Sequence, residues 1–226
     1  MRLVVRAILV LVLVQICLGI DLSNTLWRVI TTTNSNVDRE KNIDRILSLR
    51  QPLIEIMLGN SGLDINCVRY LDDNGIRVSK TYWNGQTDKI HTGKLGHWCS
   101  FLRFLDSIHE SGKSVGVWIE DDVGLTNADI DNIIAIMNQD HKKPEIRMSA
   151  GDGVVIVFDA LQMLKLVKHR EITNPVDVFF SNHGMVEIAP ALTFIKNEYN
   201  QSDITTTKEY PIDYVNQMIE LRMTPE

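Results

Sequence analysis

One short apolar run constrains the fold of this chain more than any other segment. From Val115 to Ile119 the sequence reads Val-Gly-Val-Trp-Ile, with no polar residue in alternate positions. A strand without this alternation is typical of the middle of a parallel sheet that helices cover on both faces. Glu120, Asp121 and Asp122 follow the run directly. Ligands of α/β sheets bind beyond the carboxyl ends of the strands, so the acidic tripeptide lies where a site is expected.

The segments around this run alternate between strand and helix patterns. Strands are predicted at residues 27–30, 53–58, 66–71 and 154–158, and helices at 39–49, 95–108, 127–137 and 160–167. Residues 72–75 are predicted to form a turn, and residues 176–180 form a short apolar segment after Pro175. The alternation predicts an α/β fold with a mixed, mostly parallel sheet and right-handed crossovers. The length of 226 residues suits one such domain.

The N-terminus has the pattern of a secretory signal peptide. Arg2 and Arg6 precede an apolar run from Ala7 to Val14, and small residues follow up to Gly19. Cleavage after Gly19 leaves a domain of residues 20–226, in the lumen of the endoplasmic reticulum or Golgi or outside the cell. The alternative is an uncleaved signal anchor, although the apolar run is shorter than the ~20 residues of a membrane span. With cleavage, no stable membrane span is expected.

The cysteines and a glycosylation sequon bear on the same compartment. Cleavage leaves Cys67 and Cys99, which either form a disulfide in an oxidising compartment or remain two buried thiols. Asn200, with Gln201 and Ser202, forms an N-glycosylation sequon, as in a glycoprotein. The net charge of −6, without a run of Lys and Arg, argues against nucleic acid as a partner.

The acidic tripeptide needs a compensating charge. Three consecutive carboxylates repel each other, and partial desolvation after a buried strand increases this cost. A divalent cation such as Mn²⁺ or Mg²⁺ removes the conflict, because hard cations prefer carboxylate oxygens and share their shell with substrate phosphates. Glu120 and Asp122 are two residues apart and can face one side, so they are the predicted metal ligands. Asp121 would then point elsewhere, to a sugar hydroxyl; the alternative for the whole tripeptide is a solvated loop that caps the next helix.

Gly93 to Ser100 reads GKLGHWCS, and after a helix Val117 to Val123 reads VWIEDDV. These two stretches resemble glycosyltransferase family 25. The family includes bacterial lipopolysaccharide glycosyltransferases and animal procollagen galactosyltransferases. Its members show a Gly-rich entry to a helix with a Ser-His pair, then a strand ending Leu-Glu-Asp-Asp-Val. This chain departs from the pattern at Phe101, where the family has His, and at Ile119, where it has Leu.

Weaker matches follow in the same order along residues 27–205. They are Arg28 to Ile30 with Asp38-Arg39, Val154 to Ile156 with the helix from Ala160, Pro175-Val176-Asp177, Pro190, and Gln201 to Ile204. The resemblance implies a GT-A fold, which is a single Rossmann-like domain. It also implies a hexosyltransferase that moves a sugar from a uridine-based nucleotide sugar to a hydroxyl of a glycan or glycoprotein, with inversion.

The resemblance also implies roles for individual residues. Inverting transfer needs a general base, and Asp177 is the first candidate, followed by His183 and Glu187. His183 is alternatively a metal ligand. Donor-binding residues are predicted near the first strand, at the entry to the helix at 95–108 and in the acidic tripeptide. They are Thr31, Thr32, Arg39, Lys94 and Asp121.

Two other classes compete with an active transferase. A catalytically inactive relative that binds a glycan or a protein is suggested by Phe101 in place of the family's His. A phosphoryl-transfer enzyme or hydrolase is disfavoured, because the chain has neither a Gly-x-Ser-x-Gly elbow nor a Gly-x-x-x-x-Gly-Lys loop.

Overall fold

A computed structural model describes most of the chain beyond the predicted signal peptide. The described ranges are 22–32, 37–49, 53–60, 62–85, 88–149, 153–190, 192, 195–196 and 208–224. The signal peptide at residues 1–19, the sequon at Asn200 and the family-like stretch from Gln201 to Ile204 lie outside these ranges.

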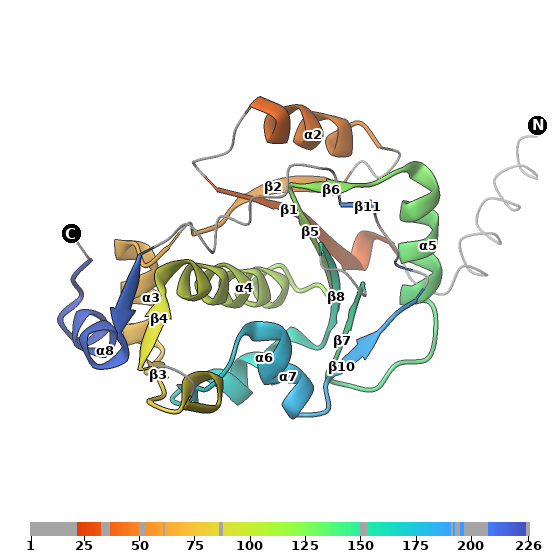
Figure 1. Ribbon diagram of the computed structural model, residues 1–226. Helices are drawn as coiled ribbons and strands as arrows, with labels where there is room; N and C mark the ends of the chain where they lie inside the picture. Colours follow the sequence, from red (N-terminus) through yellow and green to blue (C-terminus); the bar gives the residue numbers. More distant parts are fainter. Residues whose placement is uncertain are drawn as a thin grey trace, which may run out of the picture.

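Within the described ranges, six strands form a central sheet in the order β10-β7-β8-β5-β1-β2 (Figure 1). Their bounds are β1 Thr25–Thr31, β2 Ile54–Leu58, β5 Val115–Glu120, β7 Glu145–Met148, β8 Val154–Phe158 and β10 Val186–Ile188. Parallel pairings join β1 to β2 and β5, and β10 to β7, whereas β8 runs antiparallel to both β5 and β7. This arrangement confirms the predicted α/β class with a mixed, mostly parallel sheet.

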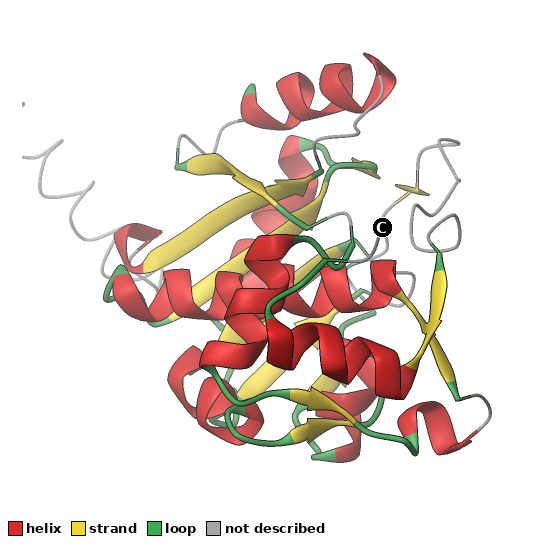
Figure 2. Cartoon of the chain, turned by 90° about the vertical axis from the view of Figure 1, so that its left-hand side faces the viewer, coloured by secondary structure: helices red, strands yellow, loops and turns green. Residues whose placement is uncertain are grey.

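Helices cover both faces of the sheet, as Figures 1 and 2 show. They are α2 Val37–Leu47, α3 Ile65–Asp73, α4 Thr92–Glu110, α5 Asn127–Met137, α6 Ala160–Val167, α7 Val176–Asn182 and α8 Ile212–Leu221. Short 3-10 helices occupy Leu22–Asn24 and Tyr82–Gly85, called η1 and η2. None of the helices in the described ranges combines the length and the apolar character needed to cross a bilayer.

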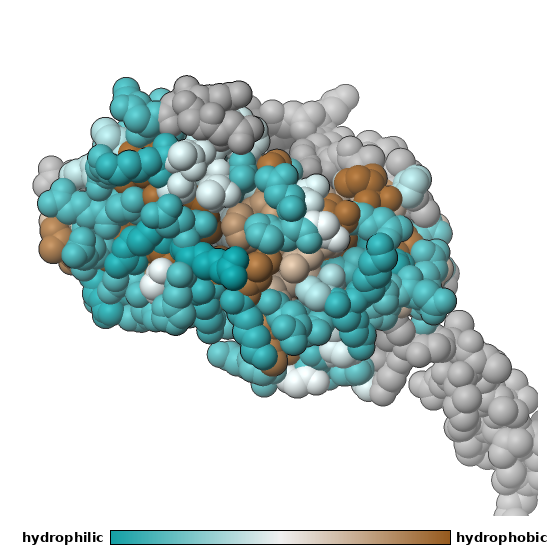
Figure 3. All heavy atoms as spheres, turned by 90° about the horizontal axis from the view of Figure 1, so that it is seen from below, coloured by the Kyte–Doolittle hydropathy of each residue, from teal (hydrophilic) through white to brown (hydrophobic). Residues whose placement is uncertain are grey.

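Three two-stranded ribbons flank the sheet within the same ranges. They pair β3 Arg77–Val78 with β9 Glu171–Ile172, β4 Lys89–His91 with β12 Glu209–Pro211, and β6 Val123–Gly124 with β11 Ile195–Lys196. The outer side of α6 and α7 faces the viewer in Figure 3, where hydrophilic residues predominate and hydrophobic ones form separate areas.

Strand β5 contributes to two hydrophobic cores, one on each face of the sheet. Trp118 packs into the core that α3, α4, α6, α7 and α8 share. Val117 and Ile119 pack into the core with α2 and α5. Every residue from Val115 to Ile119 is buried. The unbroken apolar run therefore has the cause that the sequence predicts: helices exclude water from both faces.

The strand prediction for residues 66–71 is wrong, because these residues belong to helix α3. Asp64 accepts a hydrogen bond from the backbone N–H of Cys67 and so caps the helix. Cys67, Val68 and Leu71 then share the buried face, which is the i, i+1, i+4 spacing of a helix. Asp72 and Asp73 end the helix, so only the later part of the predicted turn is confirmed.

Residues 176–180 also fold as a helix, within α7. The other predicted elements are confirmed, with small differences at their ends: the strands at 27–30, 53–58 and 154–158, and the helices at 39–49, 95–108, 127–137 and 160–167.

Candidate functional site

A cavity of about 600 Å³ opens beside the carboxyl ends of β1, β2 and β5. These strands run parallel, so their carboxyl ends meet at one edge of the sheet. Seven of the residues singled out from the sequence line it: Thr32, Arg39, Lys94, Glu120, Asp121, Asp122 and Asp177. The fold therefore brings together side chains from β1, α2, α4, β5 and α7.

The acidic tripeptide begins inside β5 and continues into a turn. Glu120 is the last residue of the strand, and its backbone N–H donates to the carbonyl of Gly153 at 2.7 Å. Asp121 is buried, and its Oδ1 lies 3.3 Å from Nη1 of Arg39. The side-chain amide of Asn42 donates to the backbone carbonyls of Asp121 at 2.7 Å and Val123 at 3.0 Å. Helix α2 thus holds the turn through a buried ion pair and two hydrogen bonds.

Asp122 is half-buried, whereas Asp121 is buried. The Oδ1 atom of Asp122 is buried, yet it accepts no hydrogen bond from the described residues. The hydroxyl of Thr32 on the neighbouring strand end is buried in the same way. A buried polar atom without a partner is rare in folded proteins and commonly marks a bound water, ion or ligand. Both residues line the cavity.

The carboxylates of the turn provide part of the ligand set of a divalent cation. Across the described ranges, no group of three His, Cys, Asp or Glu side chains is placed to hold a metal by itself. Mg²⁺ and Mn²⁺ sites in nucleotide-dependent enzymes commonly use only one or two carboxylates, and substrate phosphates and water complete the shell. Glu120 and the buried oxygen of Asp122 match such an incomplete donor set.

Helix α4 forms one wall of the cavity. Its lining residues share one face of the helix at spacings of three and four: Gly93, Lys94, His97, Ser100 and Phe101. Lys94 Nζ lies 5.1 Å from the centroid of the Trp83 ring, which is a cation–π distance. His97 packs its ring edge-on against Trp118, with the centroids 5.7 Å apart.

Phe101 is only 2% exposed. Its ring lies 5.7 Å from that of Trp118 and 5.8 Å from that of Phe180. The side chain thus serves as an apolar part of the wall between β5 and α7.

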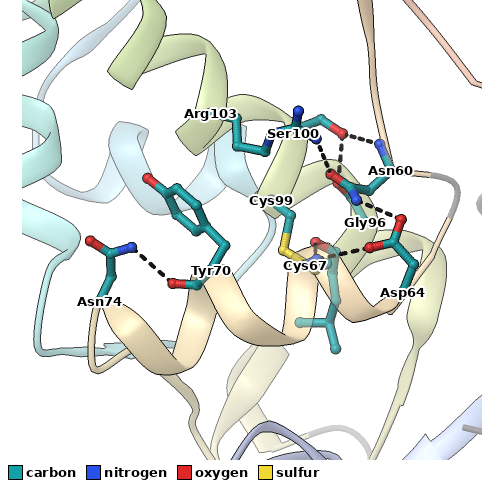
Figure 4. Close-up of a disulfide and its surroundings, with 10 residues drawn as sticks. Asn60, Asp64, Cys67, Tyr70, Asn74, Gly96, Cys99, Ser100 and Arg103 are labelled. Carbon is teal, nitrogen blue, oxygen red and sulfur yellow. Dashed lines mark hydrogen bonds between the residues drawn. A yellow bond between two sulfur atoms is a disulfide. The ribbon is translucent and has the colours of Figure 1, made fainter. Parts of the chain in front are cut away.

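The loop after β2 lies directly on α4 (Figure 4). The hydroxyl of Ser100 accepts a hydrogen bond from the backbone N–H of Asn60 at 2.7 Å and donates to the carbonyl of Gly96 at 2.8 Å. A Cβ atom added at Gly96 would lie 2.5 Å from the carbonyl oxygen of Asn60 and 2.7 Å from the nitrogen of Gly62. A glycine is needed here because the two backbones approach so closely. The Gly-rich entry to the helix therefore positions Asn60 and Gly59 at the cavity.

A disulfide lies beside this contact. Cys67 of α3 and Cys99 of α4 are bonded, with their Cα atoms 5.4 Å apart, and neither is exposed (Figure 4). Of the two states that the sequence leaves open, the structure has the disulfide. The disulfide links α3 to α4 at Cys99, the residue before Ser100.

Asp177 lies in the first turn of α7. It lines the large cavity and also a smaller one of about 270 Å³, together with Ser149 and Ser181. Burial raises the pKa of Tyr82, and the negative charge of Asp177 raises this pKa further. The position of Asp177 between two cavities allows it to face two ligands at once.

His183, Glu187 and Thr31 do not line the large cavity. His183 is exposed at the end of α7, where its Nδ1 lies 2.8 Å from the carbonyl oxygen of Phe179. Glu187 is exposed on the edge strand β10, and Thr31 is buried one residue before Thr32. His97, Asn60 and Trp118 line the cavity although sequence reasoning did not select them. Helical spacing from Lys94 is a signal that could have identified His97.

Comparison with models of known protein families finds no match for the chain, and comparison with curated proteins likewise finds none.

Proposed function

We propose that this protein is a metal-dependent glycosyltransferase of GT-A type, which moves a sugar from a uridine-based nucleotide sugar to a hydroxyl of a glycan or glycoprotein, with inversion. The observation that carries the proposal is the buried Asp122 Oδ1 without a hydrogen-bond partner among the described residues, next to Glu120 at the end of β5. The ordered sequence resemblance on both sides of this motif supports it. So does the position of the cavity at the carboxyl edge of the sheet.

The acidic turn provides the cation site in this proposal. Glu120 and Asp122 would hold Mn²⁺ or Mg²⁺, and the diphosphate of the donor would supply further oxygens. When bound, the cation would offset the negative charge that develops on the departing diphosphate. Asp121 does not need to bind the cation, because its ion pair with Arg39 holds the turn in place. Thr32 and Lys94 would bind the donor from the two sides of the cavity.

Asp177 acts as the general base. Its carboxylate accepts the proton of the acceptor hydroxyl, while the hydroxyl oxygen forms a bond to the anomeric carbon of the sugar. The bond between that carbon and the nucleoside diphosphate breaks, and the diphosphate leaves with the electron pair. Asp177 is suited to this role because it lines both the large cavity and the smaller one beside it, through which an acceptor can approach.

The proposal includes a location in the secretory pathway or outside the cell, because a signal peptide is predicted at residues 1–19. The disulfide between Cys67 and Cys99 supports this location, because disulfides persist mainly in oxidising compartments.

The decisive experiment measures release of uridine diphosphate (UDP) from a panel of UDP-sugars, with Mn²⁺ and with a chelator. We expect slow metal-dependent hydrolysis of one donor, and at least about tenfold weaker UDP binding for Asp122→Asn, the loss of one charge-assisted contact. Glu187→Gln is the matched control, because it removes a carboxylate outside the cavity. A wild-type protein that neither binds UDP nor releases it from any donor would exclude the proposal.

A non-catalytic binding protein is the second candidate, and Phe101 is the observation that favours it. A buried phenyl ring replaces the family's His, so any proton transfer by that His is lost. Metal-dependent binding of UDP without turnover of any donor, with a wide acceptor panel present, would favour this candidate over the transferase.

A further inference from the structure

His97 lies one helical turn before Phe101, the position at which the resembled family has a histidine. His97 precedes Phe101 by four residues in α4, and residues four apart lie one above the other on a helix. Both residues line the large cavity. His97 is half-buried there, whereas Phe101 is enclosed in an aromatic cluster. Among the described residues that line this cavity, His97 is the one histidine.

The place of His97 relative to the acidic turn follows from its contact with Trp118. The two rings meet edge-on with centroids 5.7 Å apart. Trp118 and Glu120 are two residues apart in β5, so their side chains leave the same face of the strand. Glu120 therefore extends from β5 on the side of the sheet where Trp118 contacts His97. The imidazole and this carboxylate line the same cavity.

The charges of the lining favour an anionic group next to His97. The basic side chains that line the cavity are Arg39, which pairs with Asp121, and Lys94 and His97 of α4. Both come from the same face of α4, one helical turn apart. A diphosphate that bridges the acidic turn and α4 would meet the cation on one side and these two side chains on the other. Hydrogen bonds to an anion from ring nitrogens are stronger than those between neutral groups.

We propose that His97 is a binding residue for the diphosphate of the nucleotide-sugar donor, to which it donates a hydrogen bond from its imidazole ring. The inference rests on the proposed function and deepens it: it assigns to α4 a phosphate contact beside the cation. Phe101 cannot contact a phosphate through a ring nitrogen, but His97 on the same face of α4 can. The site can therefore bind the leaving diphosphate without a histidine at position 101.

The test compares UDP with uridine as ligands of the full-length protein in Mn²⁺. His97→Phe keeps an aromatic ring against Trp118 but removes both ring nitrogens. His97→Gln retains an N–H donor, and His109→Phe is the matched control, because His109 is exposed at the far end of the same helix. Calorimetry measures UDP binding, ligand-detected NMR measures uridine binding, and thermal unfolding checks that each variant is folded.

We expect His97→Phe to weaken UDP binding about tenfold or more, the usual effect of losing a hydrogen bond to a charged group. Uridine binding should not change, His97→Gln should recover most of the loss, and His109→Phe should bind UDP like the wild type. Unchanged UDP affinity in His97→Phe would overturn the inference, and so would an equal loss for UDP and uridine. If His97→Phe does not fold, His97→Leu provides the same comparison. If the wild type binds no UDP, both the proposed function and this inference are wrong. If the wild type binds UDP and His97→Phe binds it equally well, only this inference is wrong.

Discussion

The two walls of the cavity are built in different ways. On the α4 side, a disulfide, the Ser100 hydrogen bonds and the close contact at Gly96 join three segments, α3, α4 and the loop after β2. On the α7 side, Asp177 is exposed in the first turn of a seven-residue helix, which packs on α4 through Phe179 and Phe180. The first wall is held by a covalent bond and hydrogen bonds, and the second presents an exposed carboxylate.

The difference indicates how the two substrates divide the site. A donor with a diphosphate needs fixed contacts, because misplaced charges lose most of their interaction energy. An acceptor that must enter and leave can use a wall with exposed side chains and a second cavity behind it. We therefore expect changes in the α4 wall to alter donor binding and stability, and changes in the α7 wall to alter transfer alone.

The largest effect is expected from Asp177→Asn. Loss of a general base lowers the rate of transfer about 10²- to 10⁴-fold, whereas UDP affinity should stay within twofold because the amide has the same shape. Transfer to an acceptor and UDP binding are measured on the same preparation, with His183→Gln as the control, since His183 directly follows α7 and lies outside the large cavity. If Asp177→Asn transfers sugar as fast as the wild type, Asp177 is not the general base. The proposed division of the site between donor and acceptor walls would then be wrong as well.

Removal of the disulfide tests the rigidity of the α4 wall. The Cys67→Ala/Cys99→Ala variant opens a loop whose ends are 32 residues apart. The expected loss in the free energy of unfolding is about 3–4 kcal/mol, measured by urea denaturation. The wild type treated with a reductant should show a similar loss. An unchanged denaturation midpoint would mean that hydrophobic packing alone holds α3 on α4.

Gly96→Ala tests the contact between α4 and the loop after β2. The added Cβ would lie 2.5 Å from the backbone oxygen of Asn60, so the loop must shift. We expect a loss of about 1–3 kcal/mol in the free energy of unfolding and weaker UDP binding, since Asn60 lines the cavity. In the control Gly112→Ala, nothing lies within 4 Å of the new Cβ, although its φ of +68° also costs about 1 kcal/mol. Normal UDP binding by Gly96→Ala would show that the loop does not shape the donor site.

The smallest effect is expected from Glu187→Gln. The side chain is exposed and lies outside the large cavity, so stability should change by less than about 0.5 kcal/mol and UDP affinity should not change. Thermal unfolding and calorimetry check this expectation. A clear loss of UDP binding would extend the donor site to β10 and make the two walls less distinct.

Much of the fold could be predicted because its signals are local. The apolar run of β5 reflects burial on both faces, and the helix at Ala160–Val167 has an apolar periodicity that is contained within the segment. The position of Glu120, Asp121 and Asp122 at a strand end follows from the same run. The strand prediction for residues 66–71 is wrong because a short apolar segment fits either a strand or a helix. The capping hydrogen bond from Asp64 and the packing of Cys67 on α4 decide between the two.

The sequence by itself determined part of the strand–helix order and the acidic turn that follows β5. Only the tertiary structure decided which distant residues share that edge of the sheet. Arg39 pairs with Asp121 across 82 positions, and Asn60 bonds to Ser100 across 40. The same packing turns His97 toward the cavity and leaves His183 outside it. Such contacts depend on how helices lie against the sheet, and the local pattern of one chain does not contain this information.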